Sequence, residues 1–298
     1  MSIDGRVAIV TGAGSGLGRS HARFLAGKGA RVVVNDLSKD AADMVASEIE
    51  AAGGEAIACA ASVTDEAAIA GLVSATMAKW GRVDILVNNA GILRDKSFAK
   101  MPLEDFRLVL EVHLMGSVIC TRAAWPIMRE QQFGRIVMTS SSSGLYGNFG
   151  QSNYGAAKMA LVGLMQTLAL EGEKYNIRVN CLAPSAATGM TQGILPEESL
   201  RLLAPEKVSP GLLALVSDNA PTRAILCAGA GHFALANVTL TQGIQVGDGP
   251  DAADEVIRNW SLISDRAGEI VPTHGFVQAE REVASASSEP PLKAVAGT

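Results

Sequence analysis

Three residues near the middle of the chain have the types and spacing to move a proton. Tyr154 and Lys158 lie four residues apart in a stretch rich in helix formers, so both fall on one face of a predicted helix that begins near Ser152. A tyrosine hydroxyl ordinarily has a pKa of about 10, and a cation beside it stabilises the phenolate and lowers that pKa. Ser141 follows a predicted buried strand, where its hydroxyl can hydrogen-bond a substrate oxygen that gains negative charge. Taken alone, the four-residue spacing of Tyr154 and Lys158 is a weak pattern, and an ordinary surface pair on a helix is the better interpretation.

A glycine-rich stretch near the N-terminus supports the catalytic interpretation. It follows a β-branched run and precedes a predicted helix, an order that cradles a pyrophosphate at the helix N-terminus. The predicted cofactor contacts in this stretch are Gly12, Ser15, Gly16, Leu17 and Gly18. Asp36 ends the next predicted strand, 18 residues after Gly18, where a carboxylate binds ribose hydroxyls and repels a 2′-phosphate. The stretch therefore predicts a dinucleotide site with NAD as the cofactor.

Alternating strands and helices must position these residues. The predicted strands cover residues 7–10, 30–36, 57–63, 83–87, 136–139, 177–182 and 224–228, with helical segments between them. This alternation predicts an α/β protein with a doubly wound, mostly parallel seven-stranded sheet, helices on both faces and a single Rossmann-type domain. Asn89, Ala90 and Gly91 come directly after the fourth strand, at the sheet edge where ligands bind in such folds.

The chain divides into a Rossmann-type part and a C-terminal extension. We expect the Rossmann-type domain to cover residues 1–247, including a substrate loop at 185–210 with a lid helix at 196–203. Residues 248–298 form a C-terminal extension with one amphipathic helix at 251–264 and a loose tail from residue 284.

Composition argues against several classes of function. The 298 residues are 48% hydrophobic with a net charge of −5, which argues against a nucleic-acid-binding surface. The apolar stretch Met159 to Leu170 contains a glycine and a glutamine, so no membrane span is predicted there. No export signal is apparent at the start, so a cytoplasmic location is expected. Four widely spaced cysteines and four histidines without ligand spacing argue against disulfides and against a metal site.

Four ordered motifs resemble the short-chain dehydrogenase/reductase family over residues 4 to 245. They are Thr11-Gly12-x-x-x-Gly16-x-Gly18, Asn88-Asn89-Ala90-Gly91, Ser141, and Tyr154-x-x-x-Lys158. Further stretches are similar to a narrower group, the (3R)-hydroxyacyl-CoA dehydrogenase domain of the peroxisomal multifunctional β-oxidation enzyme. These stretches are Val34 to Leu37, Asn88 to Asp95 and Gly144 to Gln151.

The resemblance implies a reaction and a role for each motif residue. The reaction is the NAD-dependent oxidation of a 3-hydroxyacyl-CoA to a 3-ketoacyl-CoA. Tyr154 is the acid/base, Lys158 lowers its pKa and binds the nicotinamide ribose, and Ser141 orients the substrate oxygen. Further cofactor contacts implied by the family pattern are Asn89, Ala90, Gly91, Ser62, Val63 and Pro184.

The chain departs from the family pattern at three positions. His113 stands where the family usually has an asparagine that supports a proton relay, and it is either a relay member or a core histidine satisfied by backbone. Ser62 replaces the usual acid beside adenine, which implies a weaker contact, and Ser185 replaces the usual glycine after Pro184.

Other substrates and a non-catalytic role remain open. A hydroxysteroid or another secondary alcohol is the first alternative substrate, because specificity depends on loops such as 189–203. A dinucleotide-binding sensor without catalysis is the second alternative, although such a protein would be expected to lose the tyrosine or the lysine. By family, the helices around 103–129 and 152–175 pair with a second copy, which implies a homodimer or homotetramer.

Overall fold

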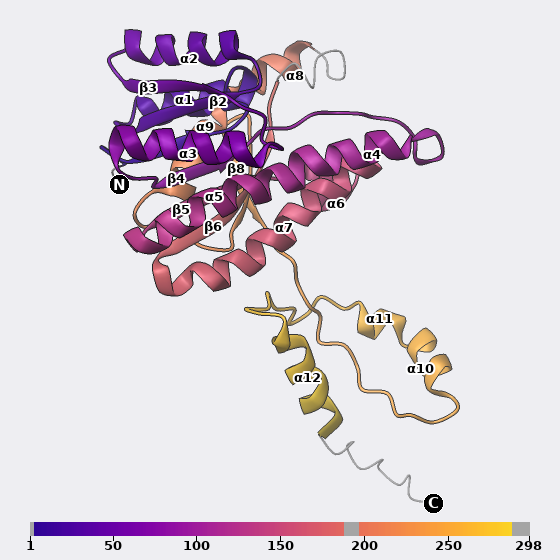
Figure 1. Ribbon diagram of the computed structural model, residues 1–298. Helices are drawn as coiled ribbons and strands as arrows, with labels where there is room; N and C mark the ends of the chain where they lie inside the picture. Colours follow the sequence, from indigo (N-terminus) through magenta and orange to yellow (C-terminus); the bar gives the residue numbers. More distant parts are fainter. Residues whose placement is uncertain (1–2, 188–196, 288–298) are drawn as a thin grey trace, which may run out of the picture. The chain divides into compact units, whose positions relative to one another are not determined.

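The computed structural model describes residues 3–187 and 197–287, apart from the side chain of Ser199. It divides into two compact units, Met1–Ala236 and Asn237–Thr298, so the division falls after Ala236 rather than after residue 247. Figure 1 shows the chain coloured from its N-terminus to its C-terminus.

The first unit is built on one sheet in which seven strands run parallel. Its strand order is β3-β2-β1-β4-β5-β6-β7-β8, the reversal at β1/β4 being typical of a doubly wound fold. The strands are β1 Val7–Val10, β2 Arg31–Asp36, β3 Glu55–Ala60, β4 Ile85–Asn88, β5 Gly134–Thr139, β6 Ile177–Ser185, β7 Ile225–Gly229 and β8 His232–Ala236. The central strands β1, β4 and β5 are buried along their whole length, as expected for a parallel sheet covered on both faces.

The eighth strand corrects the prediction of seven. β8 pairs antiparallel with β7 through a two-residue turn, Ala230-Gly231. Both turn residues have positive φ, +53° and +80°, which matches the twist of a tight hairpin. No pattern of alternating apolar and polar residues predicts β8, because its side chains are mostly exposed at the edge of the sheet.

Helices cover both faces of the sheet and enclose two apolar cores. The helices are α1 Gly16–Ala26, α2 Lys39–Ala51, α3 Glu66–Trp80, α4 Leu103–Leu110, α5 Gly116–Gln131, α6 Ser142–Tyr146, α7 Ser152–Gly172, α8 Glu197–Leu202 and α9 Ser209–Val216. Residues of α1, α2 and α9 form one core with the sheet, and residues of α3, α5 and α7 form the other (Figure 1). The predicted lid helix corresponds to α8, while residues 188–196 of the predicted substrate loop lie outside the described residues.

One long helical stretch is interrupted by a wider turn. Between α4 and α5, residues Glu111–Met115 form a π-helical turn, a local widening that often accompanies function. The whole stretch Leu103–Gln131 is the only described helix long and apolar enough to cross a membrane, by length and composition alone. Core helices pass the same test, and Cys120, Ala124 and Met128 of α5 are buried in the second core.

The second unit contains three helices instead of the single one predicted. They are α10 Ala252–Arg258, α11 Trp260–Ile263 and α12 Phe276–Ser287. The predicted helix at 251–264 is divided at Asn259, and α12 includes the first residues of the predicted loose tail. The rest of that tail, residues 288–298, lies outside the described residues.

Candidate active site

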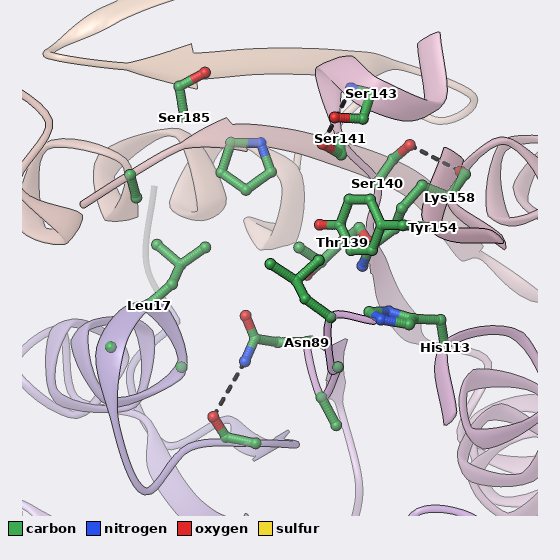
Figure 2. A pocket seen from close by; sticks show the side chains of 18 of the residues that line it. Leu17, Asn89, His113, Thr139, Ser140, Ser141, Ser143, Tyr154, Lys158 and Ser185 are labelled. Carbon is green, nitrogen blue, oxygen red and sulfur yellow. Dashed lines mark hydrogen bonds between the residues drawn. The ribbon is translucent and has the colours of Figure 1, made fainter. Parts of the chain in front are cut away.

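A pocket of about 770 Å³ opens at the carboxyl edge of the sheet. It brings together all the predicted catalytic residues and most of the predicted cofactor contacts. These are Gly12, Ser15, Gly16, Leu17, Gly18, Asp36, Asn89, Ala90, Gly91, His113, Ser141, Tyr154, Lys158 and Pro184 (Figure 2). Two predicted contacts do not line it: Ser62 is hydrogen-bonded to Thr64, and Val63 is buried against Gly116.

The glycine loop has the shape of a cradle that side chains would fill. A Cβ on Gly12 would lie 2.8 Å from the backbone of Ala90, and Gly12 has a positive φ of 60°. A Cβ on Gly18 would lie 2.1 Å from the carbonyl oxygen of Gly12. The first turn of α1 carries no acidic residue, and its N-cap Ser15 makes no side-chain capping bond. The N–H groups at this helix end are therefore available to an anion, as a dinucleotide's pyrophosphate requires.

Asp36 is fixed where the second strand reaches the pocket. One carboxylate oxygen accepts hydrogen bonds from the backbone N–H of Gly14 at 2.9 Å, and the other accepts from Ser38 N–H at 3.0 Å. A negative charge held here suits a free ribose hydroxyl and opposes a phosphate.

Asn89 links the ends of two neighbouring strands. Its side-chain amide donates to the carbonyl oxygens of Thr11 at 2.9 Å and Gly12 at 3.2 Å (Figure 2). The Thr11 hydroxyl in turn accepts from the backbone N–H groups of Asn89 and Ala90, both at 3.0 Å. This exchange holds the glycine loop against the end of β4, so the predicted motif at 88–91 supports the cradle's geometry.

Lys158 is completely buried beside Tyr154. Its ammonium nitrogen lies 5.4 Å from the centre of the Tyr154 ring and donates to the carbonyl oxygen of Thr139 at 2.5 Å. Both residues come from α7, four residues apart as predicted. Burial lowers the pKa of Lys158 from 10.5 to about 7, since the charged form loses its hydration.

The pKa of Tyr154 does not move in the direction expected from the sequence. Burial raises it, and the carboxylate of Asp95 raises it further, while the hydrogen bond to Ser141 lowers it. Burial is the largest of these causes, so the net direction is upward although Lys158 lies beside the ring. Figure 2 shows Ser141, the N-cap of α6, and Tyr154 of α7 on the same side of the pocket.

His113 lies in the π-helical turn, packed edge-on against Tyr154. The two ring centres are 5.2 Å apart at an angle of 88°. Its Nε2 atom is 2.8 Å from the carbonyl oxygen of Ile92 and 3.0 Å from the backbone nitrogen of Ile92. Its Nδ1 atom is buried without a partner among the described residues. Burial, assisted by the charge on Lys158, lowers the pKa of His113 to about 3, so the ring is neutral.

A polar wall of the pocket was not predicted. Gln151 is its centre: its side-chain oxygen accepts from the Ser143 hydroxyl at 2.8 Å and from the Asn148 amide at 3.1 Å. Its side-chain nitrogen donates to Asp95 at 2.7 Å. Ser185, Ala186 and Leu203 also line the pocket and belong to the predicted substrate loop 185–210. Further lining residues that were not predicted as contacts are Leu93, Thr139, Ser140 and Ser142. Their only sequence signal is position beside the predicted motifs.

Comparison with known proteins agrees with this geometry. The family model described as short chain dehydrogenase matches residues 6–199. A short-chain type dehydrogenase/reductase of Mycobacterium tuberculosis is 47% identical over 276 residues, covering 89% of this chain and 96% of that protein. The peroxisomal hydratase-dehydrogenase-epimerase of Neurospora crassa is 44% identical over 285 residues, but this chain spans only 32% of its length.

Solved structures give the same result. The full-length peroxisomal multifunctional enzyme type 2 of Drosophila melanogaster matches with a TM-score of 0.82 and 39% identity, over 96% of this chain and 50% of that one. A 7α-hydroxysteroid dehydrogenase, solved with NADH and 7-oxo glycochenodeoxycholic acid, matches with a TM-score of 0.72 and 33% identity, over 77% of this chain and 95% of that one.

The glycine cradle, the buried tyrosine–lysine pair and the family match lead to one assignment. The chain belongs to the short-chain dehydrogenase family, close to the dehydrogenase part of the peroxisomal multifunctional enzymes, and is an oxidoreductase that uses a nicotinamide dinucleotide.

Proposed function

We propose that the protein is an NAD-dependent dehydrogenase that interconverts a (3R)-3-hydroxyacyl-CoA and the corresponding 3-ketoacyl-CoA. The observation that carries the catalytic part is the placement of Tyr154, Lys158 and Ser141 together in one pocket with the glycine cradle. The names of the multifunctional relatives favour the acyl-CoA substrate, as does the resemblance of stretches such as Gly144 to Gln151 to that group.

The proposed roles follow from contacts in the pocket. Tyr154 takes the proton of the substrate hydroxyl, and Ser141, which lines the same pocket, orients the substrate oxygen. The Lys158 ammonium stabilises the tyrosinate electrostatically. The nicotinamide, when bound, supplies the hydride acceptor.

The preference for NAD depends on Asp36. Its carboxylate lines the pocket and is held by two backbone N–H groups. A 2′-phosphate placed near this carboxylate would meet a fixed like charge, whereas free ribose hydroxyls could donate to it. Gly12, Gly16 and Gly18 would hold the pyrophosphate, and Asn89 to Gly91 would form the adjoining wall. Ser62 and Val63 stay in the proposal as neighbours of the adenine, although they do not line the pocket.

Oligomerisation and location are also proposals. Large apolar residues are exposed on the helices that the family resemblance assigns to subunit pairing: Leu103, Leu108, Met115, Met159 and Leu170. We therefore expect a homodimer or homotetramer, and a light-scattering mass near one subunit would contradict it. A cytoplasmic location is proposed for this chain, whereas several relatives are named as peroxisomal.

A hydroxysteroid dehydrogenase is the second candidate function. The observation in its favour is the match to a 7α-hydroxysteroid dehydrogenase over 95% of that protein's length. The proposals are separated by measuring NADH formation from (3R)- and (3S)-3-hydroxybutyryl-CoA and from a hydroxysteroid. Turnover of the (3R) thioester alone supports the acyl-CoA proposal, and turnover of the steroid alone replaces it.

A further inference from the structure

The mouth of the pocket carries a surface that the proposed chemistry at Tyr154 does not use. Between β4 and α4 the chain makes a long excursion over residues 89–102, with one 3₁₀ turn at Phe98–Lys100 (Figure 1). Its first part lines the pocket as far as Leu93. The excursion lies along the turn between α6 and α7, which contributes Asn148 and Gln151 to the same pocket. The two segments therefore form a track that leads from the pocket to the surface.

Three hydrogen bonds fasten the two sides of this track. The Asn153 amide donates to the carbonyl oxygen of Arg94 at 2.9 Å. The backbone N–H of Lys96 donates to the carbonyl oxygen of Gly150 at 2.9 Å. The third bond is the one from Gln151 to Asp95 described above. The track is thus a defined surface rather than two independent loops.

Two phenylalanines stand exposed on the track. Phe98 has 77% and Phe149 has 90% of its surface exposed. Phe149 is held outward by a turn whose flanking residues, Gly147 and Gly150, have φ of +79° and +81°. Exposing two aromatic rings beside a pocket is costly for a protein in water, and flat apolar rings are good platforms for a purine base.

The same track is basic, although the chain as a whole is acidic. Arg94 and Lys96 share the single carboxylate of Asp105, at 3.8 Å and 3.3 Å, and both cations remain 49% exposed. Lys100 is exposed and has no carboxylate within ion-pair distance in the described part of the chain. The segment Arg94–Lys100 carries three cations and one carboxylate, that of Asp95, a formal charge of +2 in a chain whose net charge is −5. The excess of positive charge at the pocket mouth is therefore local. Such a site attracts a phosphorylated ligand.

We propose that Arg94–Lys100 and Gly147–Gly150, the mouth track, bind the nucleotide end of an acyl-CoA whose acyl end lies at Tyr154. This proposal rests on the acyl-CoA substrate proposed above and adds the site that recognises the carrier. Lys96 and Lys100 bind the phosphates, and the adenine stacks on Phe98 or Phe149. The slender pantetheine arm connects these groups to the pocket along the turn that contains Asn148.

A carrier series tests the proposal on the wild-type protein. The same (3R)-3-hydroxybutyryl group is supplied on CoA, on 3′-dephospho-CoA, on 4′-phosphopantetheine and on pantetheine, and NADH formation is measured. We expect KM to rise stepwise along this series while kcat changes little, with a total rise of about 10- to 100-fold between CoA and pantetheine. Equal KM values for CoA and pantetheine thioesters would overturn the proposal.

Variants of the mouth track test whether it causes this rise in KM. K96E/K100E and the double variant Phe98→Ser with Phe149→Ser should each raise KM for the CoA thioester about 10-fold and leave KM for the pantetheine thioester unchanged. Lys28→Glu, a matched charge reversal at the far end of α1, should change neither. A parallel rise for both thioesters would show a general defect and contradict the assignment.

Two further measurements keep the outcomes distinct. Binding of free CoA, measured by calorimetry in the wild type and in K96E/K100E, does not depend on turnover. If the wild type binds free CoA and K96E/K100E does not, the mouth track is supported. This holds even if no 3-hydroxyacyl thioester is oxidised, a result that would contradict the proposed function but not the track. No CoA binding to the wild type would overturn the track. A fall in light-scattering mass for the phenylalanine variant would also overturn it, by showing that the rings contact a second copy.

Discussion

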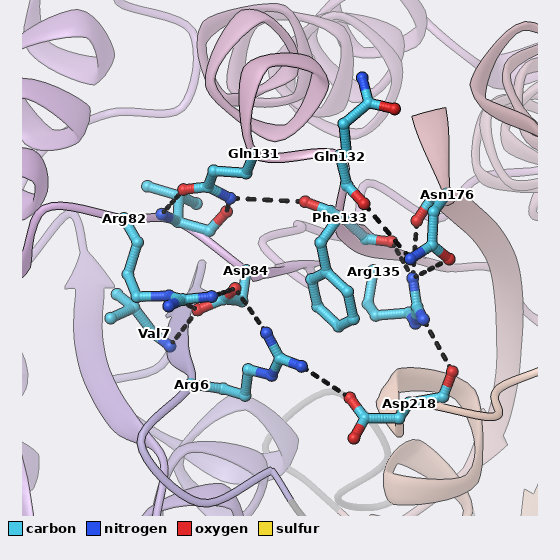
Figure 3. A network of polar contacts seen from close by, with 12 residues as sticks. Arg6, Val7, Arg82, Asp84, Gln131, Gln132, Phe133, Arg135, Asn176 and Asp218 are labelled. Carbon is cyan, nitrogen blue, oxygen red and sulfur yellow. Dashed lines mark hydrogen bonds and ion pairs between the residues drawn. The ribbon is translucent and has the colours of Figure 1, made fainter. Parts of the chain in front are cut away.

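The two edges of the central sheet differ in whether their buried polar groups have hydrogen-bond or ion-pair partners. At the amino edge, the carboxylate of Asp84 is fully buried, and Arg82 donates two hydrogen bonds of 2.7 Å to it (Figure 3). Arg6 bridges Asp84 to Asp218, and the Phe133 ring lies between the guanidinium groups of Arg6 and Arg135. The carboxylates of this network pair with guanidinium groups, and the buried Arg135 donates to several carbonyl oxygens, among them those of Ser217 and Asp218.

At the carboxyl edge, buried polar atoms are left without partners. Among the described residues these include Asn88 Oδ1, His113 Nδ1 and Thr139 Oγ1, all near the pocket. Lys158 has a single hydrogen bond, to a backbone carbonyl, and no carboxylate. Unsatisfied groups and a desolvated charge cost stability, so the amino edge stabilises the fold while the carboxyl edge keeps groups available for a ligand.

The largest expected effect of a substitution is at Lys158. Lys158→Met should lower kcat/KM for the alcohol by roughly 10²- to 10⁴-fold, because the tyrosinate loses its cation. The same variant should unfold at a higher denaturant concentration. The pKa of Lys158 is lowered from 10.5 to about 7 on folding, so the cost of burying it is greatest below pH 7 and fades as the pH rises toward 10.5.

The measurement compares urea unfolding of the two proteins at pH 6 and pH 10. We expect the gain to be roughly 1–3 kcal/mol at pH 6 and smaller at pH 10. Lys79→Met, an exposed lysine on α3, is the matched control and should change neither property. If Lys158→Met unfolded at a lower urea concentration than the wild type, burial of Lys158 would not cost stability. That result would contradict the difference between the two edges.

Asp84 provides the converse test at the amino edge. Asp84→Asn leaves Arg6 and Arg82 without their shared carboxylate, and it should lower the free energy of unfolding by about 2–4 kcal/mol. The pocket lies at the other edge, so kcat/KM of the folded enzyme should be unchanged. Asp43→Asn, which removes an exposed partner of Lys39, should leave stability nearly unaltered. A large loss of kcat/KM with normal stability in Asp84→Asn would show that the edges are not separate in function.

Two buried histidines predict the response to acid. Burial lowers the pKa of His21 and of His113 to about 3. The unfolded chain binds protons near pH 6.5 and the folded chain does not, so stability falls as the pH drops from about 6.5 toward 3. The expected loss is about 2 kcal/mol per histidine between pH 7 and pH 5. The free energy of unfolding, measured in urea at pH 7 and pH 5, should fall less for His21→Gln than for the wild type. An equal fall in the two proteins would contradict the assignment of this pH dependence to His21.

The smallest expected effects concern glycines. Gly18→Ala would place its Cβ against the carbonyl oxygen of Gly12, so it should lower stability by about 1–2 kcal/mol and raise KM for NAD. Gly71 on α3 has no atom within 4 Å of such a Cβ, and Gly71→Ala should stabilise the protein by about 0.5–1 kcal/mol. Thermal unfolding and initial rates measure both. If both variants changed stability and the KM for NAD by the same amount, the glycine loop would not require a glycine at Gly18.

Much of the carboxyl edge was predictable from the sequence because its signals are local. Strand–glycine–helix order, the acid at Asp36 and the four-residue spacing of Tyr154 and Lys158 each depend on a few neighbouring residues, and the structure places all of them in one pocket. The direction of the Tyr154 pKa was not predictable, because burial depends on packing from several distant elements. Gln151 belongs to a stretch quoted for the family resemblance, but its contact with Asp95 was not predictable, because the two residues are 56 positions apart.

The amino edge and the last third of the chain were less predictable from the sequence. The Asp84 network joins residues from positions 6 to 218, and no local pattern links them. The hairpin of β8 depends on positive φ at Ala230, a conformation for which alanine is not a typical residue. The break between α10 and α11 at Asn259 likewise lies within an otherwise continuous amphipathic pattern.

The central claim is that Tyr154 moves the proton at the carboxyl edge, and one comparison tests it directly. NADH formation from NAD and (3R)-3-hydroxybutyryl-CoA is measured for the wild type and for Tyr154→Phe, with NAD binding followed by calorimetry. We expect Tyr154→Phe to keep its affinity for NAD and to lose at least about 10²-fold in kcat. A phenylalanine variant that binds NAD and turns over at the wild-type rate would contradict the account.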